Sequence, residues 1–314
     1  MKRSSILWST VAAGLLVGLA ACSSDTGGTS SPSAKSAADG APATSTINVV
    51  ASTDVWGDVA STIGGGKVAV TSIIDKPDAD PHEYEANARN QLALAKADVV
   101  IENGGGYDDF MSRMLKSAKN DKATVLNAVD ISGRTASDGE ELNEHVWYDF
   151  PTVEKVVDRI EQSYAMADPS ASDTFSTNAD QLKSKINKLE HREASLKKTY
   201  AGQPVAITEP VPLYLLDAIG LVNKTPDDFS EAIEEDSDVS AKVLKQTLDL
   251  YSRHRVKLLA YNEQTTGPET DRVLDAAKAS GIPVVPVTET LPSGKNYVTW
   301  MTSNLDAVDT ALGQ

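Results

Sequence analysis

The chain is poor in cysteine, the residue that cross-links many small secreted domains and holds many metal ions. Cys22 is the only cysteine among 314 residues. A single cysteine excludes intramolecular disulfides and leaves no cysteine cluster for a metal site. Histidine is also scarce, with four in the chain. Each histidine can therefore be considered individually.

Positive charge is in deficit. The chain has 29 Lys and Arg residues against 45 Asp and Glu, a formal net charge of −16. Nucleic acids and anionic lipid surfaces both require a basic patch, so this balance argues against either as a partner. An acidic surface is compatible with cations, but it does not identify one.

The first 46 residues are expected to direct export of the protein and to tether it to the membrane. The positive "MKR" precedes "ILWSTVAAGLLVGLA", an apolar run too short to span a membrane comfortably, so residues 1–21 are predicted to be a signal peptide. The tetrapeptide "LAAC" that ends at Cys22 resembles the lipobox of bacterial lipoproteins. This resemblance implies that Cys22 becomes the lipidated first residue. Residues 22–46 are rich in Ser, Thr, Gly, Ala and Pro and should form a flexible tether.

Strands and helices alternate over the remainder of the chain, which predicts an α/β fold with mostly parallel sheets. We expect one α/β lobe over residues 47–170, a linking helix over 171–201 and a second α/β lobe over 202–314. The strands are expected at 47–52, 64–74, 98–105, 123–130, 204–210, 256–263 and 282–289.

Residues 171–201 carry the most regular pattern of the sequence. Apolar residues follow one another at steps of three and four, as on one face of a helix, with a gap at Glu193. The stripe is formed by Phe175, Ala179, Leu182, Ile186, Leu189, Leu196 and Tyr200. Thirty helical residues measure roughly 45 Å, which suits a spine between two lobes. A coiled-coil pairing is the alternative.

Four polar residues follow strand ends, where open α/β sheets bind ligands. His82 and His145 belong to the first lobe, and Glu209 and Glu289 directly follow strands of the second. Two imidazoles from one lobe would thus face two carboxylates from the other. His191, on the long helix, and His254, at a helix end, do not fit this arrangement.

The order and spacing of several segments resemble the cluster A-I metal-binding lipoproteins of bacterial ABC transporters for zinc and manganese (TroA/ZnuA-like). The similarity lies in "DADPHEYE", "EHVWYD", "ITEPVPLYLLDAIG" and "YNEQTTGPETDRVLDAAKASGIPVVPVTETL". It implies that His82, His145, Glu209 and Glu289 are the metal ligands. It also implies two lobes joined by one long helix, and a carrier that is not an enzyme.

The ligand set bears on which metal is bound. Two imidazoles and two carboxylates form a harder site than zinc prefers, so we expect Mn²⁺ to be favoured over Zn²⁺. The stretch "SGRTASDGEELNE" also has no histidine, whereas zinc-type members of the family often carry a histidine-rich loop there. A zinc-specific protein of the same family remains the alternative, because Zn²⁺ binds most such sites more tightly than Mn²⁺.

The expected partners are the divalent metal ion, an ABC transporter permease and the cell membrane, reached through the lipid on Cys22. We expect an extracytoplasmic monomer that binds no nucleic acid. Acidic neighbours of the two histidines, among them Glu83, Glu85, Glu144 and Asp149, are candidates to orient the imidazoles. Trp56 and Trp147 are candidates to wall the site.

Two readings of other classes stay open on the sequence alone. A cell-surface metallohydrolase would need an open metal position, and neither H-E-x-x-H nor G-x-S-x-G occurs in the chain. A binding protein for a metal chelate would place arginines at the strand ends, where this sequence has none.

Overall fold

The computed structural model describes residues 46–76, 84, 87–136 and 142–314. The predicted signal peptide, Cys22, the tether up to residue 45 and His82 lie outside the described residues. The part of the chain that follows residue 43 forms one compact unit.

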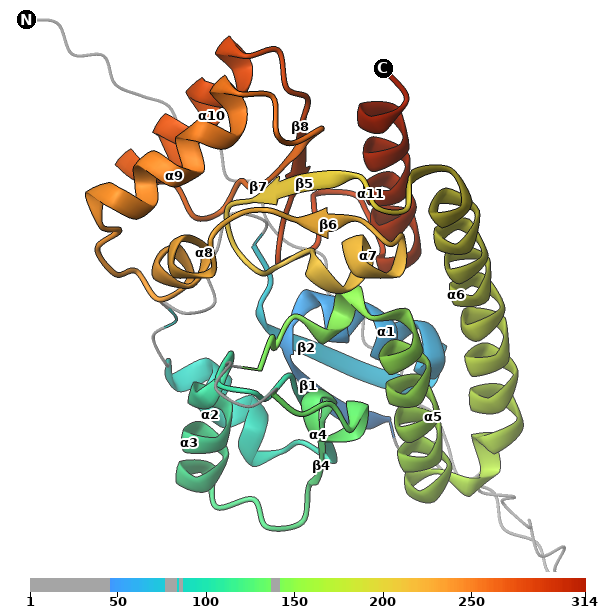
Figure 1. The fold of residues 1–314 in the computed structure, drawn as a ribbon. Coiled ribbons are helices and arrows are strands. Elements are labelled where there is room, and N and C mark those ends of the chain that lie inside the picture. Colours follow the sequence, from blue (N-terminus) through green and yellow to red (C-terminus); the bar gives the residue numbers. More distant parts are fainter. Residues whose placement is uncertain (1–45, 77–83, 85–86, 137–141) are drawn as a thin grey trace, which may run out of the picture. The chain divides into compact units, whose positions relative to one another are not determined.

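The first lobe is built on a four-stranded parallel sheet with the strand order β2-β1-β3-β4 (Figure 1). Its strands are β1 Ile47–Thr53, β2 Val68–Ile74, β3 Val99–Glu102 and β4 Thr124–Asn127. Its helices are α1 Asp54–Gly64, α2 Ala88–Ala95, α3 Asp109–Ala118, α4 Ala128–Ser132 and α5 Phe150–Ala167. All seven residues of β1 except Asn48 are buried, as expected for a strand covered on both faces.

The second lobe repeats this topology with the strand order β6-β5-β7-β8, again parallel. Its strands are β5 Pro204–Ile207, β6 Val222–Asn223, β7 Leu259–Asn262 and β8 Val284–Val287. Its helices are α7 Leu213–Ala218, α8 Asp227–Glu234, α9 Ala241–Ser252, α10 Pro268–Ala279 and α11 Tyr297–Leu312. The strand order reverses between β5 and β7, which is where this class of sheet leaves a crevice for a ligand.

The predicted α/β alternation with two parallel sheets is confirmed, with shorter strands and three additional elements, α4, β6 and α8. The strand expected over 123–130 ends at Asn127, because the Asn127 side chain accepts a hydrogen bond from the backbone N–H of Asp130 (2.9 Å) and so caps α4. The sequence analysis did not predict β6, which is two residues long, or α8.

One long helix, α6, runs over Ser172–Tyr200 and lies beside both lobes (Figure 1). It packs against α1 and α5 of the first lobe and against α7 and α11 of the second. Its buried face follows the predicted stripe from Phe175 to Leu196, so the predicted long helix is confirmed. The gap in the stripe is not an exposed position, because Glu193 is itself buried.

Hydrogen bonds also join the lobes directly. The Tyr148 hydroxyl donates to the carbonyl oxygen of Thr288 (2.9 Å), and the Tyr297 hydroxyl donates to that of Trp147 (2.7 Å). The backbone N–H of Tyr297 donates to the Asp58 carboxylate on α1 (2.9 Å). A single hydrophobic cluster extends from β1 through α6 to α11. The mutual orientation of the lobes is therefore fixed by a shared core as well as by α6.

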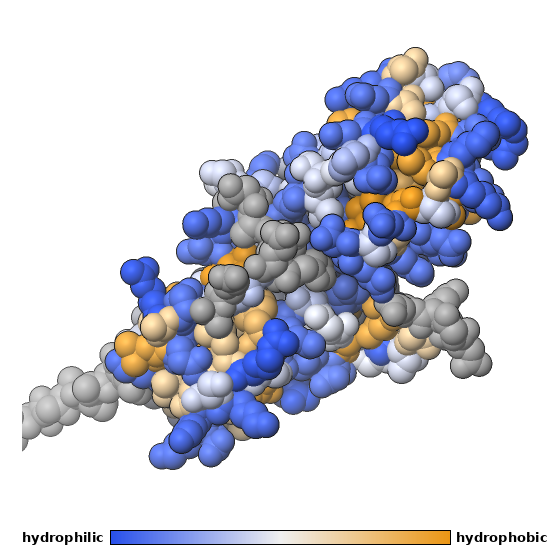
Figure 2. Space-filling view, turned by 90° about the vertical axis from the view of Figure 1, so that its left-hand side faces the viewer, coloured by the Kyte–Doolittle hydropathy of each residue, from blue (hydrophilic) through white to orange (hydrophobic). Residues whose placement is uncertain are grey.

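The face of the molecule in Figure 2 is mostly hydrophilic and carries several hydrophobic patches. The large apolar side chains that are exposed lie on four different elements: Leu92, Val125, Met166 and Val222. Among the described residues, no helix has the length and apolar character needed to cross a membrane.

Candidate metal centre

His145 lies in the loop between α4 and α5, immediately before a short 3₁₀ turn at Val146–Tyr148. The side chain is completely buried. Its ring stacks edge-on against Trp147, with 5.1 Å between ring centroids, and faces Tyr107 at 6.0 Å. Trp147 therefore walls the site, as expected. Trp56 is buried in the core, and its indole N–H donates to Asn103 (3.2 Å).

Asn143 fixes the orientation of this imidazole and the nitrogen that carries its proton. The Asn143 Nδ2 donates to the carbonyl oxygen of Pro210 (3.1 Å), and its Oδ1 accepts from the backbone N–H of His145 (3.0 Å). These two bonds orient the amide, so its oxygen faces Nδ1 of His145 at 2.8 Å. Nδ1 must then carry the proton, which leaves Nε2 as the metal-binding atom. Of the acidic neighbours that the structure describes, neither Glu144 nor Asp149 orients Nδ1.

Glu209 follows β5 at the point where the strand order reverses. It is 3% exposed, and its carboxylate accepts hydrogen bonds from Thr265 and Asn262. Burial raises the pKa of Glu209 well above its usual value, and the nearby carboxylates of Glu234 and Glu289 raise it further. Its Oε2 makes no hydrogen bond with any described residue.

Glu289 follows β8 and is 2% exposed. Its Oε1 accepts a hydrogen bond from Asn262 Nδ2 (2.8 Å), and its backbone N–H donates to Gln264. Asn262, at the end of β7, thus contacts both strand-end glutamates of the second lobe. Tyr107 of the first lobe lies close to Glu289. Burial raises the pKa of the Tyr107 hydroxyl, and the nearby Glu289 carboxylate raises it further.

Glu234 is a further member of the site that the sequence analysis missed. It is the last residue of α8, and its Oε1 lies 3.4 Å from Nε2 of His145. The Pro226-Asp227-Asp228 sequence is a helix-start signal and could have indicated α8. No sequence pattern indicates that its last residue faces a histidine in the other lobe, because that contact depends on tertiary packing.

Of the four predicted ligands, Glu209 and Glu289 lie near each other in the second lobe, and His145 lies beside Glu234, whose charge also acts on Glu209. The fourth, His82, lies outside the described residues, as do Glu83 and Glu85. Asp149 is held elsewhere, in an ion pair with Arg134 (2.8 Å). His191 and His254 are exposed, as expected for histidines without a role in the site.

The site concentrates negative charge where water is largely excluded. Glu209 and Glu289 are almost fully buried, and the side chain of Glu234 is 12% exposed. Buried like charges are costly unless a cation neutralises them or they take up protons. An imidazole nitrogen among several carboxylate oxygens is a donor set suited to a divalent transition metal.

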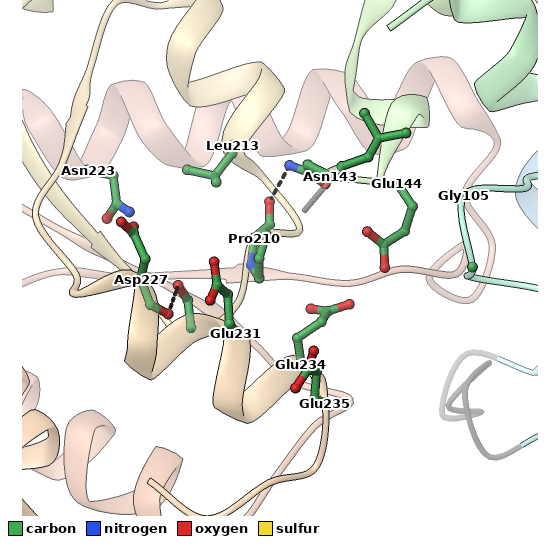
Figure 3. Close-up of a pocket in the computed structure, with 13 residues that line it drawn as sticks. Gly105, Asn143, Glu144, Pro210, Leu213, Asn223, Asp227, Glu231, Glu234 and Glu235 are labelled. Carbon is green, nitrogen blue, oxygen red and sulfur yellow. Dashed lines mark hydrogen bonds between the residues drawn. The ribbon is translucent and has the colours of Figure 1, made fainter. Parts of the chain in front are cut away.

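A cleft of about 710 Å³ lies beside His145 and is lined by Glu144 and Glu234, whereas Glu209 and Glu289 are not part of its lining (Figure 3). Its lining is rich in carboxylates from the His145 loop and from α8, and Figure 3 shows that Glu144 and Glu234 point toward the same space. The acidic lining residues are Glu144, Asp227, Glu231, Glu234 and Glu235.

Two parallel-sheet lobes, a long helix beside both and a buried histidine–carboxylate group define a two-lobed metal-binding protein. The chain belongs to the family described as zinc-uptake complex component A, periplasmic, whose profile matches residues 49–311. This confirms the resemblance drawn from the sequence motifs. The family consists of substrate-binding proteins of metal transporters, and the chain is accordingly a binding protein rather than an enzyme.

Individual relatives agree with this assignment. The manganese-binding lipoprotein MntA of Halalkalibacterium halodurans is 30% identical over 145 residues, which cover 46% of this chain and 47% of that protein. The manganese ABC transporter substrate-binding lipoprotein scaA of Streptococcus gordonii is 24% identical over 95% of this chain and 96% of its own length. The structure of the periplasmic zinc-binding protein TroA from Treponema pallidum superposes with a TM-score of 0.72 at 19% identity, covering 85% of this chain and 99% of that one.

Proposed function

We propose that the protein captures a divalent transition metal between its two lobes, with Mn²⁺ favoured over Zn²⁺, and delivers it to the permease of an ABC transporter. The proposed ligands are His82, His145, Glu209 and Glu289. The observation that carries the proposal is the orientation of His145. Asn143 faces Nδ1, so Nε2 is the nitrogen available to a metal ion, and this buried atom lies 3.4 Å from the Glu234 carboxylate of the other lobe.

The proposed preference for manganese rests on the character of the donor atoms. Mn²⁺ favours oxygen-rich sites of higher coordination number, whereas Zn²⁺ favours four nitrogen and sulfur ligands. Glu209 and Glu289 can each bind through two oxygens, so the set supports more than four coordinate bonds. The manganese-binding relatives support the same choice.

Zinc is the second candidate, and it has specific support. The structure superposes on a zinc-binding protein. The intrinsic affinity of nitrogen and oxygen sites is also higher for Zn²⁺ than for Mn²⁺. Selectivity in the cell would then depend on metal supply and on the geometry imposed by the lobes.

The proposed location is the outer face of the cell membrane, with the protein held there by lipid on Cys22 and by the tether. The relatives named as lipoproteins support this placement. A tethered carrier stays close to its permease, which raises the effective concentration of one for the other.

The decisive experiment is elemental analysis of protein purified without chelator, followed by competition between Mn²⁺ and Zn²⁺ at equilibrium. We expect one metal ion per chain to survive purification of the wild-type protein and none to survive purification of His82→Ala, His145→Ala or Glu289→Gln, because any residual binding in these variants is weak. His191→Ala is the matched control, because His191 is exposed on α6, and it should retain full stoichiometry. One metal per chain in the Glu289→Gln protein would refute the ligand assignment, and a dominant zinc content would decide for the second candidate.

A further inference from the structure

The described residues contain one group of at least three potential metal-ligating side chains with all ligand atoms close together. It consists of Glu144, His145 and Glu234, whose ligand atoms all lie within 4.8 Å of one another. Only His145 belongs to the set proposed above. Glu144 and Glu234 are not among the predicted ligands, although Glu144 was named from the sequence as a candidate to orient the imidazoles.

The two carboxylates come from the two different lobes. Glu144 precedes His145 in the loop of the first lobe, and Glu234 ends α8 in the second. Both line the acidic cleft and face each other across it (Figure 3). Glu144 is partly buried and the Glu234 side chain is 12% exposed, and both line the cleft, which Glu209 and Glu289 do not. Glu144 and Glu234 are thus the carboxylates that a cation in the cleft would meet beside the imidazole.

The imidazole of His145 makes this group more than an acidic cluster. The ring is completely buried, yet Nε2 has no hydrogen bond to a described residue and lies 3.4 Å from Oε1 of Glu234. Because Asn143 holds the Nδ1 proton, the atom that faces Glu234 is the metal-binding nitrogen. An imidazole nitrogen next to a carboxylate oxygen offers two donor atoms to one metal ion.

We propose that Glu144, His145 and Glu234 form an outer position for a divalent transition metal, through which the ion passes to the inner position of Glu209, Glu289 and His82. The two positions share Nε2 of His145, so they are alternatives and the chain holds one ion at a time. The inference rests on the proposed metal-carrier function and extends it with a capture step.

The lining of the cleft suits this capture step. Asp227, Glu231 and Glu235 add negative charge around the outer position. Clefts lined by one sign of charge concentrate the opposite ion and accelerate its association. Glu144 and Glu234 line the cleft itself, whereas Glu209 and Glu289 do not, so an ion that enters the cleft would meet the outer position first.

The test uses Mn²⁺ alone and the full chain in two backgrounds. In the Glu209→Gln/Glu289→Gln protein, we expect weak binding of one Mn²⁺ to persist, detected as loss of the free Mn²⁺ electron paramagnetic resonance signal. Adding Glu234→Gln to this background should weaken the residual binding by tenfold or more, in the roughly 10–100-fold range typical of metal-site changes. In the otherwise wild-type chain, Glu234→Gln should slow Mn²⁺ association by roughly tenfold and keep a stoichiometry of one.

Asp236→Asn provides the matched control. Asp236 is exposed two residues beyond Glu234, does not line the cleft and has a left-handed backbone (φ 49°) that asparagine tolerates. It should leave the residual binding intact. Equal association rates for wild type and Glu234→Gln would overturn the outer position, as would residual binding that survives Glu234→Gln. Failure of the wild-type chain to bind any metal would instead overturn the proposed function.

Discussion

The carbonyl oxygen of Pro210, next to Glu209 in the second lobe, accepts a hydrogen bond from Nδ2 of Asn143 in the first lobe (3.1 Å). The same amide holds Nδ1 of His145 through its oxygen. One side chain therefore couples the contact between the lobes to the orientation of a proposed metal ligand.

Replacement of Asn143 should weaken metal binding without removing a ligand. We expect Asn143→Ala to lower Mn²⁺ affinity by roughly 10–100-fold, because the imidazole loses the acceptor that fixes its tautomer. Asn143→Asp keeps an oxygen acceptor for His145 and should lose less. Calorimetric titration of both variants measures the difference. An Asn143→Ala protein with wild-type affinity would refute the positioning role.

Replacement of Glu209 by glutamine should raise the stability of the metal-free protein and weaken metal binding. Burial and the carboxylates of Glu234 and Glu289 raise the pKa of Glu209, so at neutral pH the folded metal-free protein must either hold a proton that the unfolded chain lacks or bear a buried charge, and both lower its stability. We expect Glu209→Gln to stabilise the metal-free protein by roughly 1–3 kcal/mol, the usual cost of an imperfectly satisfied buried group.

Thermal melts with and without Mn²⁺ check this expectation. The wild-type melting temperature should rise with Mn²⁺, because a ligand that binds only the folded state stabilises it. The Glu209→Gln protein should melt higher without metal and respond much less to it. Glu263→Gln, at an exposed position just after β7, should behave as wild type in both conditions. A metal-free variant that melts below wild type would contradict the argument.

Glu193 gives the protein a pH-dependent stability that is separate from the metal ligands. Burial raises its pKa to about 8, and the charges of Glu190 and Asp149 add to the effect. The folded protein therefore holds a proton that the unfolded chain releases near the ordinary glutamate pKa. Stability contributed by this proton is lost as the pH rises from about 4.5 to about 8. We expect Glu193→Gln to stabilise the protein by roughly 1–3 kcal/mol at pH 8 and by clearly less at pH 5.

Urea unfolding of both proteins at pH 5 and pH 8 measures this difference. Asp180→Asn is a suitable control, because Asp180 is exposed on the same helix and its ion pair with Lys183 is a surface pair of little energy. An equal gain at both pH values would show that Glu193 does not hold a proton in the folded state.

The shared core of the two lobes should restrict their motion. Tyr148, Tyr297 and Asp58 join the lobes independently of α6. We therefore expect the radius of gyration to change by no more than about 1 Å when metal binds, as in other preorganised complexes. Small-angle scattering of metal-free and Mn²⁺-loaded protein tests this. A large compaction would mean that the lobes close by a wide hinge.

The fold could be predicted where the sequence carries a local period. The apolar stripe from Phe175 to Leu196 indicated α6, and β-branched runs indicated the longer strands. Elements that lack such a period were missed. Strand β6 has only two residues, Val222 and Asn223, and its place is set by pairing with β5. Helix α8 is short, and its apolar residues are too few to show a repeat.

The site divided in the same way. His145, Glu209 and Glu289 could be proposed as ligands because they follow strand ends or lie in a recognisable motif, and the structure buries all three. The role of Asn143 could not, because it depends on Pro210, 67 residues away along the chain. Glu234 also required tertiary structure, because its partner His145 lies in the other lobe.

The hydrogen bonds from Tyr148 to Thr288 and from Tyr297 to Trp147 join the two lobes close to the proposed ligands His145 and Glu289 in the sequence. Opening of the lobes would break these hydrogen bonds together with the hydrophobic core around them. We therefore expect unloading at the permease to occur by local loosening, in which one short segment such as α8 or the His145 loop gives way. A transporter that recognises this carrier would then displace that segment on docking. Metal release would depend on docking rather than on spontaneous opening of the lobes.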